Sequence, residues 1–409
     1  MMFSFGPGND SSKITELKRN PGMRKILMLN IFGMERSNAE LIHFSSLANG
    51  FISLGYDVTV VHVSAKGRTT HRDILSNDVK FKEIVVRGRW YTLFITSTMA
   101  ISRFLKIIKD LKPEILYVRL SIFSAIYVLT LRFLKADHIK IITEHNGWIG
   151  PEARIKGMNP FIVWIGGVLQ RYSALKSDMI RAVSEGIKSY LISLGAKDSR
   201  IFIIGNGTDI KHFRPLGITP VYEVGFIGNL VKWQGLDILV DAFYLVTREK
   251  PGIRMAIAGS GPEEKNITKR LKALGIEDHV DMLGDIPYKD APDVINSYKI
   301  CMAPKIVFSS KEYPHVFYSY SPLKIRDYAA CGKPIIASRI RGLEEIEEAG
   351  FGLLVPPGKA RPMADAILRL IDNPRLCEIM GRKARTYAEK NYSWDIVAMR
   401  ISENISREP

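Results

Sequence analysis

The segment Ser319–Ser338 carries the clearest chemical pattern in the chain, because it is typical of a helix whose start binds an anion. Ser321 is a favourable N-cap, and Pro322 suits the first helical position, where its missing N–H costs nothing. The backbone N–H groups of Leu323 and Lys324, the helix dipole and the Lys324 ammonium would then converge on one point. We expect a phosphate to bind at that point.

A carboxylate follows one turn later on this helix. Asp327 is three residues beyond Lys324, so both side chains lie on one helical face, and Gly332 is placed to end the helix. An acceptor for sugar hydroxyls therefore stands beside the phosphate site, and the pair suits a sugar nucleotide. The alternative interpretation is an ordinary capped helix in an α/β domain, since capping residues are common.

The same segment resembles the donor-binding motif of the retaining glycosyltransferases of family 4, which have the two-domain GT-B fold. In that family an acidic pair, Glu-x7-Glu, brackets the helix start, and the second Glu binds the ribose of the nucleotide. Asp327 stands at the second position and Ser319 at the first. The resemblance therefore implies ribose binding by Asp327, while Ser319 leaves the first position of the donor site without its carboxylate.

Length and composition indicate a folded protein of two domains. The chain has 409 residues, of which 46% are hydrophobic and 24% charged. The three cysteines, Cys301, Cys331 and Cys377, have no Cys-x-x-Cys or Cys/His ligand spacing. This argues against a disulfide framework and against a zinc site, and it fits a reducing cytoplasm.

The positive charge is concentrated in the first half of the chain. The net charge is +16, and residues 1–215 carry 31 Lys and Arg against 17 Asp and Glu. Such a surface can attract anionic lipid, nucleic acid or a phosphorylated substrate. Nucleic acid is disfavoured because no basic helix with base-reading residues and no recognisable module is present. A basic surface with no partner is the remaining alternative.

No stretch reaches the roughly 18–20 uninterrupted apolar residues that a membrane-spanning helix needs. Ile115–Leu131 comes nearest, but Arg119 interrupts it, and the first 23 residues lack the apolar core of a secretory signal. We therefore expect a cytoplasmic protein that is soluble or bound peripherally to the inner face of the membrane.

Strand and helix patterns alternate at the start of the chain, after a breaker-rich leader, residues 1–22, that we expect to be poorly ordered. Apolar runs at Arg24–Asn30 and Val58–Val63 predict buried strands, and Asn38–Leu54 predicts the helix between them. This order favours a parallel α/β sheet. In the family that the chain resembles, the first loop, here with Gly33, faces the interdomain cleft.

The segment Thr143–Gly147 follows directly on a predicted strand, where open α/β sheets bind ligands. The family often has a His or an acidic residue in the corresponding loop near the donor sugar. The resemblance therefore implies catalytic roles for Glu144 and His145. Otherwise they are strand-end residues satisfied by hydrogen bonds.

Two helical patterns combine apolar and basic residues. Thr98–Leu111 has one apolar stripe with Lys and Arg on the remaining surface, and Pro160–Leu169 contains Phe161 and Trp164. A basic amphipathic helix can lie on a membrane surface. A surface helix more commonly packs its stripe against the sheet, and the sequence leaves both readings open.

The segment Ile201–Pro215 resembles the Asn-Gly-x-Asp-x-x-x-Phe-x-Pro sequence that closes the family's first domain, and its Asn-Gly turn and following breakers mark a boundary. We expect two Rossmann-like α/β domains that face a central cleft. The expected division is an N-terminal acceptor-binding domain (23–214), a C-terminal nucleotide-sugar-binding domain (215–385) and a helix that returns to the first domain (386–409).

Three loops of the second half resemble donor-binding loops. After Gly228 the family often has an Arg and a Lys that hold the diphosphate, whereas this chain has Asn229 and Gln234. Lys232 is the nearby cation, which either contacts phosphate or points to solvent. The second loop contains the turn Gly259-Ser260-Gly261, whose backbone can approach phosphate closely. The third loop contains Leu283, and in the family this loop meets the base of the nucleotide.

The resemblance extends over nearly the whole chain after residue 22, and it implies transfer of a sugar from a UDP- or GDP-sugar to an acceptor with retention at the anomeric carbon. Lys324 would act catalytically by stabilising charge on the leaving diphosphate. The acceptor, a sugar, a lipid-linked sugar or a phospholipid, would bind the basic first domain.

No Asp-x-Asp occurs in the chain, so we expect activity without a metal or other cofactor. The alternatives are a non-catalytic nucleotide-sugar-binding protein and an epimerase or phosphorylase of the same fold.

Overall fold

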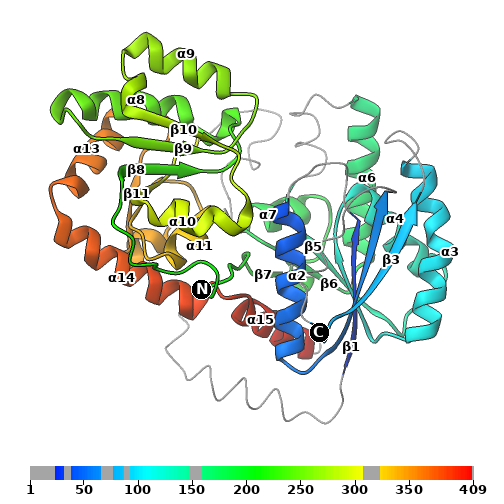
Figure 1. Cartoon of the computed structure of the whole chain (residues 1–409). Coiled ribbons are helices and arrows are strands. Elements are labelled where there is room, and N and C mark those ends of the chain that lie inside the picture. The colour runs from blue at the N-terminus through cyan, green and yellow to red at the C-terminus, as the bar shows by residue number, and fades with distance from the viewer. Residues whose placement is uncertain are drawn as a thin grey trace. The chain divides into compact units, whose positions relative to one another are not determined.

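The computed structural model of the chain describes residues 24–31, 38–65, 77–86, 93–147, 159–306 and 323–407. They form two compact units (Figure 1). The first unit runs to Val183, resumes over Ile187–Ile204 and ends with the chain from Trp394 onward. The second consists of Ser184–Gly186 and Gly205–Ser393. The leader 1–22 lies outside the described residues.

The first unit is built on a parallel sheet with seven strands in the described residues, in the order β3-β2-β1-β4-β5-β6-β7. Its strands are β1 (Lys25–Ile31), β2 (Asp57–Ala65), β3 (Lys80–Val86), β4 (Ile115–Arg119), β5 (Lys140–His145), β6 (Met179–Ala182) and β7 (Ile201–Ile203). The central strands β1 and β4 are nearly continuous apolar runs because both faces of the sheet are covered by helices, whereas β3 at the edge carries Lys80, Lys82 and Glu83.

Alternate residues of the strands in the first unit enter two separate cores. Met28 and Tyr117 pack towards α2 (Asn38–Ser53) and α15 (Trp394–Ser406), which lie side by side (Figure 1). Leu27 and Leu116 pack on the opposite face. The other helices of this unit are α3 (Leu93–Leu111), α4 (Ile122–Phe133), α6 (Pro160–Lys176), α7 (Glu185–Ser193), which belongs to it from Ile187 onward, and the 3-10 turn η3 (Asp198–Arg200).

The second unit repeats this architecture with six parallel strands in the described residues, in the order β10-β9-β8-β11-β12-β13. The strands are β8 (Tyr222–Ile227), β9 (Met255–Ala258), β10 (Val280–Gly284), β11 (Tyr298–Ala303), β12 (Ile335–Ser338) and β13 (Gly352–Val355). The helices are α8 (Leu236–Glu249), α9 (Glu264–Leu274), α10 (Ala291–Asn296), α11 (Leu323–Ala330), α12 (Glu345–Glu348), α13 (Ala360–Ile371) and α14 (Pro374–Asn391). Single 3-10 turns are η4 (Lys232–Gln234), η5 (Glu277–His279) and η6 (Tyr288–Asp290).

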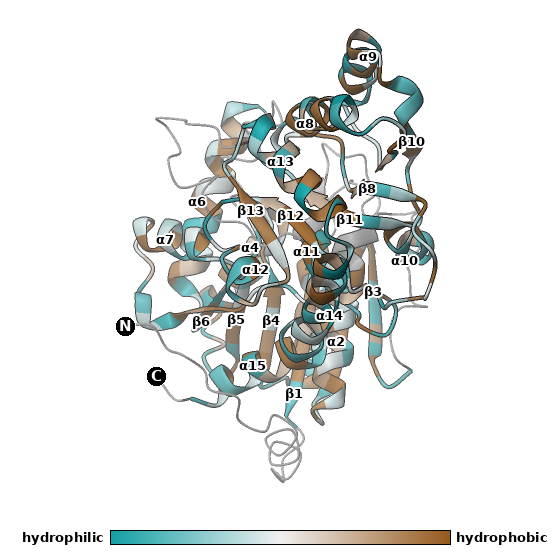
Figure 2. Cartoon of the chain, turned by 90° about the vertical axis from the view of Figure 1, so that its left-hand side faces the viewer, coloured by the Kyte–Doolittle hydropathy of each residue, from teal (hydrophilic) through white to brown (hydrophobic). Residues whose placement is uncertain are grey.

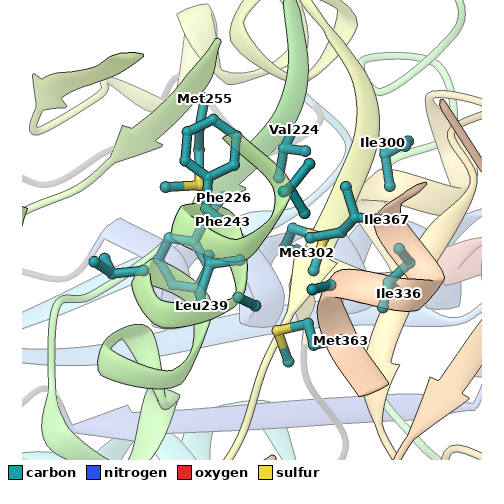
Figure 3. Packing of buried hydrophobic residues seen from close by; sticks show 14 of the residues in the cluster. Val224, Phe226, Leu239, Phe243, Met255, Ile300, Met302, Ile336, Met363 and Ile367 are labelled. Atoms are coloured by element: carbon teal, nitrogen blue, oxygen red, sulfur yellow. The ribbon is translucent and has the colours of Figure 1, made fainter. Parts of the chain in front are cut away.

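The larger core of the second unit lies between its sheet and helices α8 and α13 (Figure 3). Phe226 of β8, Phe243 of α8 and Ile367 of α13 are buried there. The strands are largely hydrophobic, whereas the helices alternate between hydrophobic and hydrophilic residues (Figure 2). The expected class, α/β with two Rossmann-like units, is confirmed by this pair of parallel sheets.

The units part at positions that differ from the expected domain limits. The first unit ends at Ile204 and not at 214, because the segment that follows packs in the second unit, where Phe213 is buried against Tyr288 with ring centroids 5.5 Å apart. Residues 386–393 also belong to the second unit, since Ala388 of α14 is buried in its core. Only α15, from Trp394, returns to the first unit.

Helix α15 is held in the first unit by close backbone approach to α2 and by polar contacts with Tyr56 and Lys140. A Cβ on Gly50 would lie 2.8 Å from the carbonyl oxygen of Trp394, so only glycine fits there. The hydroxyl groups of Tyr56 and Ser402 lie 2.6 Å apart, and the Lys140 ammonium donates to the carbonyl of Ile405 at 2.8 Å. None of the described helices is long and apolar enough to cross a membrane.

Candidate functional site

The loops that follow β8 and β9 lie against each other because two glycines leave room for backbone. A Cβ on Gly259 would be 2.0 Å from the carbonyl oxygen of Gly228, and one on Gly261 would be 2.4 Å from that of Leu230. The Leu230 amide donates to the Ser260 carbonyl at 2.8 Å. Gly228, Gly259 and Gly261 have positive φ angles of 146°, 126° and 156°, which residues with an L side chain rarely adopt. The predicted glycine loops therefore come together.

The Lys324 ammonium lies at this pair of loops. Its Nζ would be 2.7 Å from a Cβ at Gly228, and it stands 3.7 Å from the ring centroid of Phe226. It donates a hydrogen bond to Oε1 of Gln234 at 3.2 Å. The structure thus brings together Lys324 of α11 and the loop after β8, two segments to which the family resemblance assigns donor binding.

No carboxylate in the described ranges forms an ion pair with Lys324. Its described partners, the Gln234 amide and the Phe226 ring, carry no net charge. Burial, with the nearby Lys305, holds the pKa of Lys324 well below its usual range. An incompletely compensated, partly buried cation beside glycine-rich backbone is a favourable place for an anion.

Helix α11 begins at Leu323, so Leu323 and Lys324 are its first residues in the described part of the chain. The predicted N-cap Ser321, with Pro322 and Ser319, lies outside the described residues, as does Gly33 of the first unit. One side of the helix, which includes Ile325 and Tyr328, is buried.

Asp327 faces a different neighbour from Lys324. Its Oδ1 accepts a hydrogen bond from the Thr208 hydroxyl at 2.6 Å, and the Thr208 amide in turn donates to the carbonyl of Tyr392 at 2.7 Å. Burial raises the pKa of Asp327 to about 7, while the Thr208 hydrogen bond and Arg326 lower it. The carboxylate thus titrates in the physiological range and is held towards the segment that opens the second unit.

The remaining predicted donor residues occupy the same sheet edge with different exposure. Asn229 and Lys232 are exposed, and Leu283 at the end of β10 is partly buried against the smaller core of this unit. The Gly259 amide donates to the carbonyl of Gly284 at 2.6 Å, which brings the β10 loop to the glycine pair. Across the described residues no three His, Cys, Asp or Glu side chains converge on a point that could hold a metal ion.

In the first unit Glu144 is the centre of a buried polar network. Its Oε2 accepts from Nη1 of Arg181 at 2.6 Å, and its Oε1 lies 3.1 Å from Nε2 of His43. Tyr117 and Asn146 also donate to it. Burial alone would raise the pKa of Glu144, but His43 and Arg181 outweigh it and hold that pKa well below the usual range. Glu144 is therefore an ionised, fully paired carboxylate that is buried between the sheet and α2.

His145 points to the opposite face of the sheet and is 1% exposed. Its Nε2 lies 3.2 Å from the Thr143 hydroxyl, and its Nδ1 lies 3.4 Å from the Gln170 amide nitrogen. Burial lowers the pKa of His145 to about 3, so the ring is neutral near pH 7. These contacts suit strand-end residues satisfied by hydrogen bonds, the alternative that the sequence left open; catalytic roles for Glu144 and His145 stay predictions.

Two partners of the predicted residues were not selected from the sequence. Gln234, the acceptor for Lys324, occupies the position at which the family often has Lys, and that substitution was its only signal. Thr208, the partner of Asp327, is 119 residues away along the chain and carries no motif of its own beyond its place in the boundary segment.

Comparison with known proteins bears on the family and the fold of the chain. The family model "Glycosyltransferase Family 4" matches residues 42–212, and the model "Glycosyl transferases group 1" matches residues 209–387. The crystal structure of HepE from Anabaena in complex with UDP and glucose is 17% identical in sequence, with a TM-score of 0.70, and the match covers 94% of this chain and 100% of that one. At this identity the likeness establishes the fold alone.

Among curated relatives, an uncharacterized glycosyltransferase of Methanocaldococcus jannaschii is 23% identical over 54% of this chain and 56% of its own. A GDP-mannose-dependent monoacylated α-(1-6)-phosphatidylinositol monomannoside mannosyltransferase of Corynebacterium glutamicum is 26% identical over 50% of this chain and 55% of its own. The chain thus spans about half the length of the curated relatives it matches. Because the two family models together span most of the chain, from residue 42 to residue 387, it belongs to the family 4 glycosyltransferases of the GT-B fold.

Proposed function

We propose that the chain is a retaining glycosyltransferase that moves a sugar from a UDP- or GDP-sugar to an acceptor in glycan or glycolipid biosynthesis. The observation that carries the proposal is the position of Lys324, whose Nζ lies beside Gly228 with the neutral Gln234 as its hydrogen-bond acceptor. A nucleoside diphosphate is the donor product whose charge this cation suits.

Three groups of the second unit would bind the donor. Lys324 would contact the diphosphate, and the backbone N–H groups at the start of α11 would add to the positive potential there. Asp327 would accept from the ribose hydroxyls by sharing or exchanging its hydrogen bond from Thr208. In this arrangement the neutral amide of Gln234 accepts a hydrogen bond from Lys324 and positions its ammonium, at the place in the sequence where the family often has Lys.

The reaction breaks the bond between the anomeric carbon and the diphosphate oxygen. The new bond forms between that carbon and the acceptor oxygen, whose proton passes to the leaving phosphate. Lys324 lowers the barrier by stabilising the negative charge that develops on this phosphate. No covalent enzyme nucleophile is required, and attack on the face from which the phosphate departs accounts for retention.

We further propose that activity needs no metal and no other cofactor, because the ammonium of Lys324 and the helix start supply the positive charge that a divalent ion would otherwise supply. Chelation followed by assay tests this directly. Strict dependence on added Mg²⁺ or Mn²⁺ after chelation would overturn it.

The acceptor is proposed to be lipid-linked or a phospholipid bound by the first unit, at the inner face of the membrane. The concentration of charge in residues 1–215 supports this, since anionic lipid attracts a basic surface. The relative from Corynebacterium, by its name, uses a phosphatidylinositol monomannoside. Vesicle binding at low salt is the corresponding measurement.

Product analysis separates the proposal from its alternatives. The protein is incubated with UDP- and GDP-sugars and a panel of sugar and lipid acceptors, and release of nucleoside diphosphate is followed. A transferase releases it only with an acceptor, whereas an epimerase or phosphorylase gives product with water or phosphate alone. Nucleotide-sugar binding without turnover for any acceptor would favour a non-catalytic binding protein and overturn the transferase proposal.

A further inference from the structure

Helix α6 of the first unit has its small and polar residues on the inner side. Gln170, Ser173 and Ser177, in and just after the helix, are each at most 1% exposed. The Gln170 amide donates to the Gly147 carbonyl at 3.3 Å, and the Ser173 hydroxyl donates to the carbonyl of Ala125 in α4 at 3.4 Å. The helix is therefore docked on α4 and on the end of β5 largely through polar and small groups.

The opposite side of α6 presents large apolar residues to solvent. Phe161, Trp164 and Tyr172 are 64%, 63% and 52% exposed, and Ile165 and Val168 between them are partly exposed. The spacing of three, four, seven and eleven residues from Phe161 places all five on one helical stripe. We call this stripe the outer face of α6.

The inner side of α6 also buries Val163 and Ala174, but its aromatic residues lie on the other side, whereas an ordinary surface helix turns its apolar stripe to the core. The rings of Phe161 and Trp164 lie against each other, with centroids 6.0 Å apart and an angle of 25° between their planes. Both side chains are more than half exposed, so most of their surface lies outside the packing of the unit. A contiguous exposed apolar face of this kind marks an interaction surface.

The charges on α6 indicate what the outer face binds. Residues 160–176 contain no Asp or Glu, and the two cations, Arg171 and Lys176, are both exposed. They extend the positive charge of the first half of the chain along the same helix. Aromatic residues that enter the lipid boundary, with Arg and Lys near the headgroups, are the composition of helices that lie in a membrane interface.

The helix also lies where such a contact would serve the reaction. Its chain follows β5 and returns to β6, which is parallel to β5, so the first turn of α6 lies towards the carboxyl ends of the strands. Open α/β sheets bind their ligands at that edge. Figure 1 shows α6 standing beside α4 in the first unit.

We propose that the outer face of α6 docks on an anionic bilayer surface, with Phe161 and Trp164 inserted at the lipid boundary and Arg171 and Lys176 near the headgroups. This inference rests on the proposed function in one respect: the acceptor is taken to be lipid-linked or a phospholipid, which the docked surface would present to the site.

The test is co-sedimentation of the full chain with vesicles of phosphatidylcholine, with and without phosphatidylglycerol, at low salt. The double variant Phe161→Ser/Trp164→Ser is compared with wild type and with Phe133→Ser. Phe133 is the last residue of α4, is 86% exposed and lies outside the outer face of α6, so it is a matched loss of one exposed aromatic. The proposal predicts that wild type binds the anionic vesicles, that the double variant partitions about a hundredfold more weakly, which is about tenfold for each aromatic removed, and that Phe133→Ser partitions like wild type.

Three results would overturn the proposal. Wild type fails to bind anionic vesicles, Phe133→Ser weakens binding as much as the double variant, or light scattering shows that wild type self-associates and the double variant does not. The last result would make the outer face a contact between copies of this chain. Nucleotide titration of the same proteins keeps the two proposals apart, because intact nucleotide binding without vesicle binding removes only this inference, whereas vesicle binding without nucleotide binding removes the donor site.

Discussion

The ammonium of Lys324 occupies the space that any side chain at Gly228 would need, with Nζ 2.7 Å from the position of a Cβ there. These residues are separated by about half of the second unit in sequence and meet where β8 has ended and α11 begins. The glycine thus serves two purposes, because its φ of 146° turns the loop and its missing side chain leaves room for the cation. The proposed donor site follows from this pairing.

Replacing Gly228 by Ala should displace the Lys324 side chain and weaken nucleoside diphosphate binding. We expect a loss of about tenfold or more, the scale of one charge-assisted hydrogen bond. Gly275→Ala is the matched control, because Gly275 also has positive φ, 66°, yet a Cβ there would meet nothing within 4 Å. Calorimetric titration of both variants measures the difference. Equal affinity in the two would argue against a role for the space at Gly228.

Lys324→Met should weaken diphosphate binding about tenfold to a hundredfold and, at the same time, stabilise the unliganded protein at neutral pH. The stability gain follows because burial lowers the pKa of Lys324, so the unfolded chain binds this proton more tightly than the folded one. The wild type should therefore gain stability as pH rises towards the ordinary Lys pKa, and the variant should lack that gain.

Thermal unfolding between neutral and alkaline pH measures this effect of Lys324, with the exposed Lys232→Met as control. A Lys324→Met variant that is less stable than wild type in the absence of ligand, with unchanged nucleotide affinity, would show that Lys324 is a structural residue.

Asp327 should impose a pH dependence on both stability and donor binding. Its pKa is raised from 3.8 to about 7, so the folded protein binds the proton more tightly than the unfolded chain does. The stability from this group is complete below about pH 4 and is lost as pH rises through about 7. Ribose binding needs the ionised form and should strengthen over the same rise. Asp327→Asn should abolish both slopes, whereas Asp285→Asn, at an exposed position, should leave them in place.

Glu144→Gln should destabilise the first unit by about 3–5 kcal/mol, because it leaves the buried Arg181 guanidinium without its carboxylate. Urea unfolding measures the loss, and Glu114→Gln, at an exposed carboxylate, should cost about 1 kcal/mol or less. A Glu144→Gln protein that keeps its stability but loses turnover would support catalysis by Glu144 over the structural role.

The variant His145→Gln separates a structural role from a catalytic role for His145 in the same way. The ring is buried and neutral, and its contacts are with Thr143 and Gln170, so a structural role predicts lower stability with kcat reduced only in proportion to unfolded protein. A fall in kcat of about a hundredfold at unchanged melting temperature would assign it a role in the chemistry.

The sequence predicted the elements whose signals are local. The buried strand at Lys25–Ile31, the glycine loop at Gly259 and the helix that starts near Leu323 follow from apolar runs, turn residues and helix-start chemistry in adjacent positions. The return of the C-terminal helix to the first unit came from the family resemblance, not from such local signals.

Other contacts between distant segments were not predicted from the sequence. The hydrogen bond from Thr208 to Asp327 joins residues 119 positions apart, and the unit boundary at Ile204 depends on the packing of Phe213 on Tyr288. The direction of Glu144 and His145 to opposite faces of β5 was implicit in strand periodicity, but the partners that bury them come from α2, β6 and α6.

The central claim, that α11 and its Lys324 bind the diphosphate of a nucleotide-sugar donor, is tested most directly by metal-free calorimetric titration of UDP, GDP, ADP and their common sugar conjugates. The titrations use wild type, Lys324→Met and Asp327→Ala. We predict selective binding of one nucleotide by wild type, weaker by about tenfold or more in each variant. Binding of none of these nucleotides by wild type, or equal affinity in all three proteins, would contradict the claim.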